Sequence, residues 1–255
     1  MLLVIDAGNT ETVLGVFEGD ELMDHWRIAT VRGRTEDEYR LLLGGLLAGE
    51  GYERAKLTGV ALASVVPPVA AALRAVASDL ADGPLLEVGP GVKTGMPILI
   101  DNPREVGADR IVNAVAAASM YGTPAVVVDF GTSTNFDVVS SAGEYIGGVI
   151  ATGLEVSQEA LVRATAALRR VELTPPRSVI GKGTVEAIQS GLLYGHAGLV
   201  DGVMQRIIAE LGDEVHTLAT GGLAPTIVPF CSTVDTVDQF LTLHGLRMVF
   251  GLNHE

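Results

Sequence analysis

The chain opens with a run of apolar residues that stops at a carboxylate. Residues 2–5 are all apolar, which is typical of a strand buried on both faces, and Asp6 follows them directly. Small and turn-forming residues come next, and two further strands are predicted at 12–17 and 22–28. In such a meander the first turn exposes backbone N–H groups that can cradle a polyphosphate. An ordinary β-hairpin with Asp and Asn in its turn accounts for the same residues.

The same pattern occurs again near the middle of the chain. Apolar residues 125–128 are followed by Asp129, a glycine and hydroxyl residues that include Thr132, and two further strands are predicted before residue 151. Asp6 and Asp129 lie 123 positions apart, close to half the chain. This repetition indicates an internal duplication.

Helices are predicted where apolar residues recur at helical spacing between capping and chain-breaking residues. Thr35 and Glu38 form a capping-box pattern at the start of the first helix. The elements predicted after the first meander are a helix to about residue 49, a strand at 60–66, a helix at 69–80, a strand at 85–88 and a helix at 108–120. Those predicted after the second meander are helices at 156–169, 184–211 and 237–250, and a strand from 215 that ends in a Gly-Gly turn. The alternation predicts two α/β domains with mixed sheets and helical cover, residues 1–118 and 119–255.

The most distinctive polar cluster lies just before the predicted helix at 108–120. Pro103 and Gly107 break the chain there, and Asp109 falls in the first helical turn. The positive end of the helix dipole favours the ionised form of an aspartate at this place. Helix capping alone is the structural alternative for Asp109. Because a cation at a helix start is disfavoured by the dipole, we expect Arg110 to face a specific anion or another chain.

Composition limits the partners that the protein can have. The 255 residues are 48% apolar and carry a formal net charge of −14, which argues against nucleic acid or an anionic membrane surface as a partner. Cys231 is the only cysteine, so neither a disulfide framework nor a thiolate metal cluster is expected. The first apolar run stops at Asp6 without a preceding basic region, and no apolar run approaches membrane-spanning length. We therefore expect a cytosolic protein without a secretory signal.

Taken in order, these motifs resemble those of the type III pantothenate kinases, the ATP-dependent enzymes that open coenzyme A biosynthesis in many bacteria. They are Asp6-Ala-Gly-Asn-Thr10, Asn102-Pro-x3-Gly-Ala-Asp-Arg110, Asp129-Phe-Gly-Thr132, Gly147-Gly-x-Ile150, Thr184-x4-Gln189-Ser-Gly191 and Thr220-Gly-Gly222. The resemblance covers essentially the whole chain. The Gly-Ala-Asp-Arg element together with both Asp-Gly-Thr hairpins is specific to this family, whereas each hairpin alone indicates only the actin-like ATPase and sugar-kinase superfold. The implied fold is a pair of duplicated actin-like, ribonuclease H-like domains whose mixed sheets carry helices on both faces.

The resemblance also implies a role for particular residues. The phosphate-binding loop would consist of Asp6, Ala7, Gly8, Asn9, Thr10, Glu11, Thr12 and Val13. Asp6 would serve Mg²⁺, directly or through water, Thr132 would contact the ATP phosphates, and Asp129 would ligate a monovalent cation, K⁺ or NH₄⁺. The pantothenate site would be lined by Gly107, Ala108, Asp109 and Arg110, with Asp109 as the base. Thr184 would reach pantothenate from the other subunit of a homodimer whose substrate pocket lies at the interface.

Three departures from the family pattern bear on substrate affinity and loop rigidity rather than on the reaction class. Ile100 stands where members often carry a tyrosine that contacts substrate. Thr152 replaces the usual proline of the Gly-Gly-x-Ile-Ala-Pro-Gly loop, and Asn135-Phe136 follows the second hairpin where a small residue is common.

Two other functions fit part of the pattern. A sugar or N-acetylhexosamine kinase of the same superfold would explain both hairpins, although a lone Cys231 excludes the version with a cysteine-rich zinc motif. A non-catalytic accessory or regulatory protein could retain the nucleotide fold. Intact carboxylates at Asp6, Asp109 and Asp129 argue against that second alternative.

Overall fold

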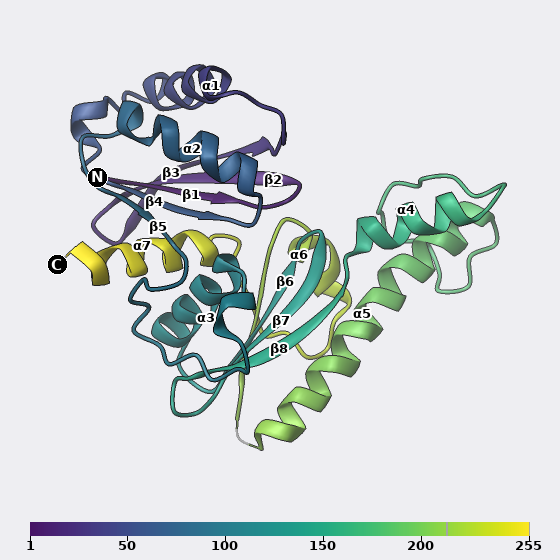
Figure 1. Ribbon diagram of the computed structural model, residues 1–255. Helices are drawn as coiled ribbons and strands as arrows, with labels where there is room; N and C mark the ends of the chain where they lie inside the picture. Colours follow the sequence, from purple (N-terminus) through teal and green to yellow (C-terminus); the bar gives the residue numbers. More distant parts are fainter. Residues whose placement is uncertain (213, 255) are drawn as a thin grey trace. The chain divides into compact units, whose positions relative to one another are not determined.

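Each half of the chain forms one five-stranded mixed sheet (Figure 1). The computed structural model describes residues 1–212 and 214–254. The strands of the first sheet are β1 (Leu2–Ala7), β2 (Glu11–Glu18), β3 (Glu21–Ala29), β4 (Val60–Ser64) and β5 (Leu85–Glu87). Those of the second sheet are β6 (Ala125–Phe130), β7 (Ser133–Val139), β8 (Tyr145–Thr152), β9 (His216–Thr220) and β10 (Thr236–Val237).

The two sheets repeat one topology. Their strand orders are β3-β2-β1-β4-β5 and β10-β9-β6-β7-β8. In each sheet an antiparallel meander of three strands continues into parallel strands, because β1 pairs in parallel with β4 and β6 pairs in parallel with β9. The predicted α/β class and the repeated meander are confirmed.

Helices cover both faces of the first sheet (Figure 1). The helical elements of the first half are α1 (Glu36–Gly49), η1 (Arg54–Lys56), α2 (Pro67–Leu80), η2 (Pro103–Glu105) and α3 (Ala108–Tyr121). Leu3, Ile5 and Leu14 pack with the buried residues of α1 and α2 on one face. The last helix, α7 (Leu241–His254), contacts β1, β2 and β4 from the other side. Gly15 of β2 leaves room for this helix, since a Cβ there would lie 3.0 Å from Leu243 Cδ1.

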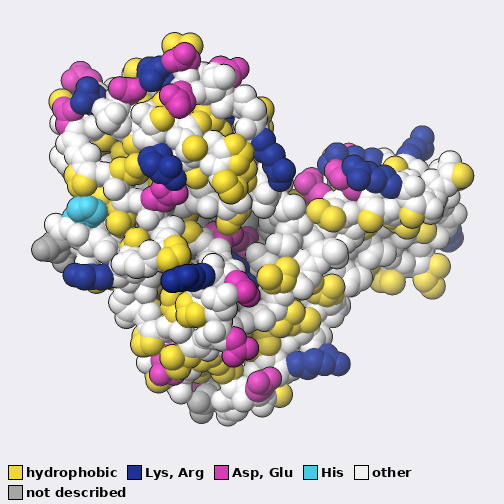
Figure 2. Space-filling model, in the orientation of Figure 1, with side chains coloured by type: hydrophobic (Ala, Val, Ile, Leu, Met, Phe, Trp, Pro, Cys, Tyr) yellow, Lys and Arg dark blue, Asp and Glu magenta, His cyan; other side chains and the backbone are white. Residues whose placement is uncertain are grey.

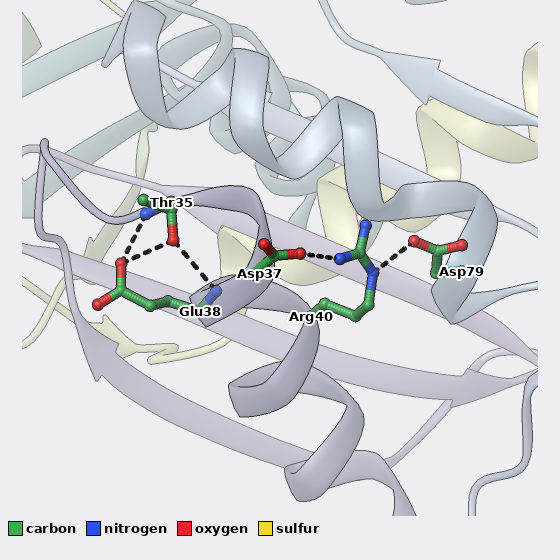
Figure 3. A network of polar contacts seen from close by, with 5 residues as sticks. All are labelled: Thr35, Asp37, Glu38, Arg40 and Asp79. Atoms are coloured by element: carbon green, nitrogen blue, oxygen red, sulfur yellow. Dashed lines mark hydrogen bonds and ion pairs between the residues drawn. The ribbon is translucent and has the colours of Figure 1, made fainter.

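The start of α1 bears out the predicted capping box (Figure 3). The Thr35 backbone N–H donates to Glu38 Oε2 over 2.7 Å, and the Glu38 N–H donates to Thr35 Oγ1 over 3.3 Å. These two bonds satisfy donors that the helix start would otherwise leave without partners. Further along α1, Arg40 contacts Asp37 and donates from Nε to Asp79 Oδ2 of α2 over 2.8 Å. The two helices on this face are therefore tied together at the surface.

One face of the second sheet packs against a long helix. The helical elements of this half are α4 (Leu154–Ala164), α5 (Thr184–Leu211), α6 (Ala224–Ile227) and η3 (Val228–Phe230). Val126, Val128 and Phe136 form a core with Leu193 and Met204 of α5. In the described ranges 1–212 and 214–254, no helix combines the length and the apolar character that crossing a bilayer requires.

The chain forms two compact units whose limits differ from the expected stretches 1–118 and 119–255. The first unit is Met1–Ala116 with Phe240–Glu255, and the second is Ala117–Gln239. The last helix groups with the first unit because its apolar residues cover the sheet face that α1 and α2 leave open. Its packing is close, since a Cβ on Gly245 of α7 would lie 2.0 Å from the Val112 carbonyl oxygen of α3.

The helix predicted at 156–169 ends earlier, at Ala164, in the structure. The following segment turns back toward the sheet, where the Val171 backbone N–H donates to Gln158 Oε1 of α4 over 3.1 Å. Val171 is thereby buried in the core beneath α5. Burial of this side chain explains why the helical pattern does not continue.

Candidate functional site

The first turn, residues 8–10, closes tightly at the end of β1. Asp6 is the penultimate residue of that strand. The Gly8 N–H donates to the Glu11 carbonyl oxygen over 3.0 Å, and a Cβ on Gly8 would lie 3.2 Å from the same oxygen. The remaining turn residues are exposed. A short exposed turn after a carboxylate can bind a phosphate through its backbone N–H groups.

Two arginines that no sequence motif marks lie beside this turn. Arg32 Nη2 donates to Asn9 Oδ1 over 3.3 Å, and Arg27 pairs with the Glu11 carboxylate. They place positive charge next to the first turn of a chain whose net charge is −14. Each arginine is more than fifteen positions from its partner in the sequence, so no local motif predicts the contact.

The first turn of α3 holds the carboxylate of Asp109 against the backbone. The Arg110 N–H donates to Asp109 Oδ1 over 2.9 Å. Burial raises the pKa of Asp109 above its ordinary value, while the N–H and the positive charge of Arg110 act in the opposite direction. Gly107 makes this arrangement possible, because a Cβ there would lie only 2.3 Å from Asp109 Oδ1.

The start of α3 lies close to the end of β1. A Cβ on Gly107 would be 3.5 Å from Val65 Cγ1, and the Val65 backbone N–H donates to the Ala7 carbonyl oxygen over 3.2 Å. Val65 directly follows β4, which pairs with β1. Within the first unit, the fold therefore brings the Gly-Ala-Asp-Arg element beside the strand end that carries Asp6.

The second turn, residues 131–132, is held by hydrogen bonds to backbone carbonyl oxygens and is packed closely by glycines. The Gly131 N–H donates to the Ser133 carbonyl oxygen over 3.0 Å. The Gly153 N–H donates to the Thr132 carbonyl oxygen over 3.2 Å, and a Cβ on Gly153 would lie 2.3 Å from that oxygen. Only glycine at position 153 allows the end of β8 to pack against this turn.

The Gly-Gly turn after β9 packs against the end of β6, at Asp129 and Phe130. Thr220 of β9 pairs with Asp129 of β6, and Gly221 follows with φ +89°, in the left-handed region that favours glycine. A Cβ on Gly221 would lie 2.4 Å from Asp129 Oδ1 and 2.7 Å from the Phe130 carbonyl oxygen. Thr152, which replaces the proline of the family pattern, accepts a hydrogen bond from Ser157 Oγ over 3.2 Å.

Thr184 is the first residue of α5. Gln189 and Ser190, which belong to the same motif, form hydrogen bonds with the loop that precedes this helix. Gln189 Nε2 donates to the Glu172 carbonyl oxygen over 2.9 Å, and Ser190 Oγ donates to the Val179 carbonyl oxygen over 2.6 Å. The glutamine and serine of the motif thus have structural roles in the loop that leads to Thr184.

A buried histidine links α5 to the strand that follows the second turn. His196 Nε2 and Thr134 Oγ1 are 2.9 Å apart, and the ring centroids of His196 and Phe130 are 6.1 Å apart. Burial lowers the pKa of His196 below its ordinary value, which favours the neutral ring. This contact agrees with a structural role for His196.

The proposed site residues fall into two groups, each placed within one unit. In the first unit, the start of α3, which carries Asp109, lies beside the end of β1, which carries Asp6. In the second unit, Asp129 lies beside the turn at 131–132 and the Gly-Gly turn. The described part of the chain contains no group of three or more His, Cys, Asp or Glu side chains that could hold a metal ion. Asp6 could still hold Mg²⁺ together with phosphate oxygens and water, which are the ligands that Mg²⁺ commonly keeps.

Comparison with protein families gives one match over most of the chain. The family model described as type III pantothenate kinase matches residues 2–206. A protein named type III pantothenate kinase from Acidothermus cellulolyticus is 55% identical over 99% of both chains. Proteins of the same name from Frankia alni and Myxococcus xanthus are 56% and 52% identical, over 99% and 100% of this chain and 100% and 99% of their own.

Solved structures with much lower identity share the fold. The activator of 2-hydroxyisocaproyl-CoA dehydratase from Clostridium difficile, with bound ADPNP, has a TM-score of 0.53 at 14% identity and covers 98% of this chain and 94% of its own. A polyphosphate/ATP-glucomannokinase from an Arthrobacter species has a TM-score of 0.52 at 14% identity and covers 99% of both chains. At this identity the likeness concerns the fold alone.

Proposed function

Because this chain belongs to the type III pantothenate kinase family, we propose that it transfers the γ-phosphoryl group of ATP to the primary hydroxyl of pantothenate, with Asp109 as the base. The product is 4'-phosphopantothenate, in the first step of coenzyme A biosynthesis. The observation that supports the residue assignment is the position of Asp109, at the start of a helix that lies beside the end of β1.

Asp109 has the chemistry that this step needs. Phosphoryl transfer has a loose transition state, so catalysis depends on positioning and on balancing charge. Oδ1 is held by the Arg110 N–H, and we assign Oδ2 to the substrate hydroxyl, which it orients and from which it accepts the proton late in the reaction. Burial raises the pKa of Asp109 and makes its carboxylate a stronger base than an exposed aspartate.

The remaining roles concern binding. The phosphate-binding loop, residues 6–13, and the Thr132 side chain would hold the ATP phosphates, with backbone N–H groups offered by the exposed turn residues 9–10. Gly107, Ala108 and Arg110 would line the pantothenate site. Asp6 would hold Mg²⁺, which when bound neutralises phosphate charge. Asp129 would hold K⁺ or NH₄⁺, and the Phe130 carbonyl oxygen beside it is of the ligand type that such cations take.

Exposed apolar surface supports a homodimer in which Thr184 of the partner subunit reaches pantothenate. β8 is an edge strand of the second sheet, and Ile150 on it is 65% exposed. Apolar side chains are also visible on the part that contains α4 and α5 (Figure 2). The exposed apolar residues of β8 and α4 are Ile146, Val149, Ile150, Val156 and Leu161. An uncovered edge strand with apolar side chains commonly marks a protein interface.

A coupled assay of ATP turnover, with and without pantothenate and K⁺, tests this function. We expect turnover only with pantothenate, and a loss of about 10²–10⁴-fold in kcat for Asp109→Asn with ATP binding retained. Asp101→Asn, at an exposed aspartate of the same cluster, is the matched control and should keep full activity. Turnover with sugars instead would indicate a sugar kinase, and ATP binding without turnover a regulatory protein. Near-full activity of Asp109→Asn would show that another group is the base.

A further inference from the structure

Asn135 of β7 has a buried amide oxygen that no hydrogen bond accounts for. The residue is 9% exposed, and its Oδ1 has no hydrogen-bond partner among residues 1–212 and 214–254. Leaving a buried acceptor without a hydrogen bond destabilises the folded state. Most buried polar groups are satisfied, so an oxygen of this kind calls for a ligand that the protein itself does not supply.

The strand register places this oxygen next to Asp129. Asn135 is the direct partner of Asp129 in the antiparallel ladder between β6 and β7, so both side chains lie on the same face of the sheet. Directly opposed residues have Cβ atoms about 4.5–5.5 Å apart. The neighbouring pair, Val128 and Phe136, lies on the other face and belongs to the core beneath α5. Asn135 therefore faces away from that core, toward the side that carries the Asp129 carboxylate.

A third oxygen-bearing side chain continues this row. Thr220 of β9 is the partner of Asp129 on its other side, and it is 1% exposed. An amide, a carboxylate and a hydroxyl thus stand on three adjacent strands. One carboxylate among neutral oxygens balances a single positive charge, and carbonyl oxygens can replace the hydration shell of K⁺. This donor set fits a monovalent cation better than a divalent ion, which usually recruits more carboxylates.

We propose that Asn135 Oδ1 is a second protein ligand of the monovalent cation, beside Asp129. The inference rests on the proposed function, which assigns that cation to Asp129. It gives a role to a residue by which this chain departs from the family pattern. The free-energy cost of the unsatisfied oxygen is recovered when the cation binds.

Thermal unfolding of the ATP-free protein tests the inference, with K⁺ titrated against choline at constant ionic strength. A ligand that binds only the folded state raises Tm with its concentration. We expect K⁺ to raise the Tm of the wild type, and Asn135→Leu to weaken the apparent affinity for K⁺ at least tenfold. In choline alone the variant should be as stable as the wild type, because the unsatisfied oxygen is removed. Asn135→Ala, which removes the oxygen without adding a larger apolar side chain, serves as the deciding variant if Asn135→Leu does not fold.

The outcomes separate this inference from the function on which it rests. If Asp129→Asn abolishes the response to K⁺ while both Asn135 variants keep wild-type affinity, Asn135 is not a ligand and the function stands. If the wild type does not respond to K⁺ with or without nucleotide, the cation role of Asp129 and this inference both fail. Pantothenate-dependent ATP turnover would still report the kinase activity independently in that case.

Discussion

Gly107→Ala should disable the proposed base while leaving the fold intact. The added Cβ would lie 2.3 Å from Asp109 Oδ1 and 3.4 Å from its Cγ, and its other near neighbour, Val65 Cγ1, is at an ordinary 3.5 Å. The carboxylate must therefore move by about 1 Å to restore a van der Waals distance. Misplacing a catalytic group by 1 Å can cost about 10²-fold in rate, or roughly 2.7 kcal/mol of transition-state stabilisation. We expect a decrease of this size in kcat.

Steady-state kinetics with pantothenate and ATP, together with urea unfolding, measure the two effects separately. Gly45→Ala is the matched control, because this exposed glycine of α1 has no atom within 4 Å of the added Cβ. It should keep wild-type kinetics and gain about 0.5–1 kcal/mol in stability. In an Asp109→Asn background, Gly107→Ala should have little further effect on kcat, since residues that act as one unit are not additive. Wild-type kcat and pantothenate KM for Gly107→Ala alone would show that the position of the Asp109 carboxylate does not limit the reaction.

Three further predictions concern the second unit. Gly221→Ala places a Cβ 2.4 Å from Asp129 Oδ1 at a φ of +89°, so we expect at least a tenfold weaker K⁺ response in thermal unfolding; an unchanged response would exclude close packing of this turn on Asp129. His196 has a folded-state pKa below 6.5, so the unfolded chain binds the proton first as the pH falls. The free energy of unfolding measured in urea should therefore keep the full contribution of His196 above pH 6.5 and decrease below it by up to about 1.4 kcal/mol per pH unit. His196→Gln, which can still form a hydrogen bond with Thr134, should remove this pH dependence. An identical pH profile in the variant would assign the dependence to other groups. If the proposed homodimer uses the β8 edge, Ile150→Glu should give a monomer in light scattering and reduce turnover, whereas a dimeric variant would place the interface elsewhere.

Local periodicity was enough to predict most elements, but not which surface each helix covers. The hydrophobic run before Asp6 and the capping box at Thr35 are local signals, and the structure has both features where the sequence predicts them. The last helix packs on the first sheet because Gly15 leaves space for Leu243, two residues that lie more than two hundred positions apart. No local pattern indicates such a pairing, so the sequence alone predicts that this helix belongs to the domain of its neighbours in the chain.

The candidate site was predictable to the extent that its residues follow one another along the chain. The Gly-Ala-Asp-Arg element is contiguous, and so are the two turns with their carboxylates. The role that we propose for Asn135 was not predictable, because its unsatisfied oxygen and its place opposite Asp129 depend on burial and on strand register. The contact of Arg32 with Asn9 was not predictable for a similar reason, since Arg32 follows β3 whereas Asn9 lies in the turn between β1 and β2.

Glycines determine the geometry of both groups of proposed site residues as much as the acidic residues do, because other atoms occupy the space that a side chain would need. A Cβ on Gly107, Gly153 or Gly221 would lie 2.3 or 2.4 Å from an oxygen of Asp109, Thr132 or Asp129, respectively. Substitution of one of these glycines would leave every acidic residue of the sequence unchanged. It would still displace the Asp109 carboxylate, the Asp129 carboxylate or the backbone of Thr132, to which we assign the base, the cation and the phosphate roles. A related chain that keeps its three aspartates but carries a larger residue at one of these positions should therefore bind substrates weakly or turn them over slowly, although its acidic motifs look intact.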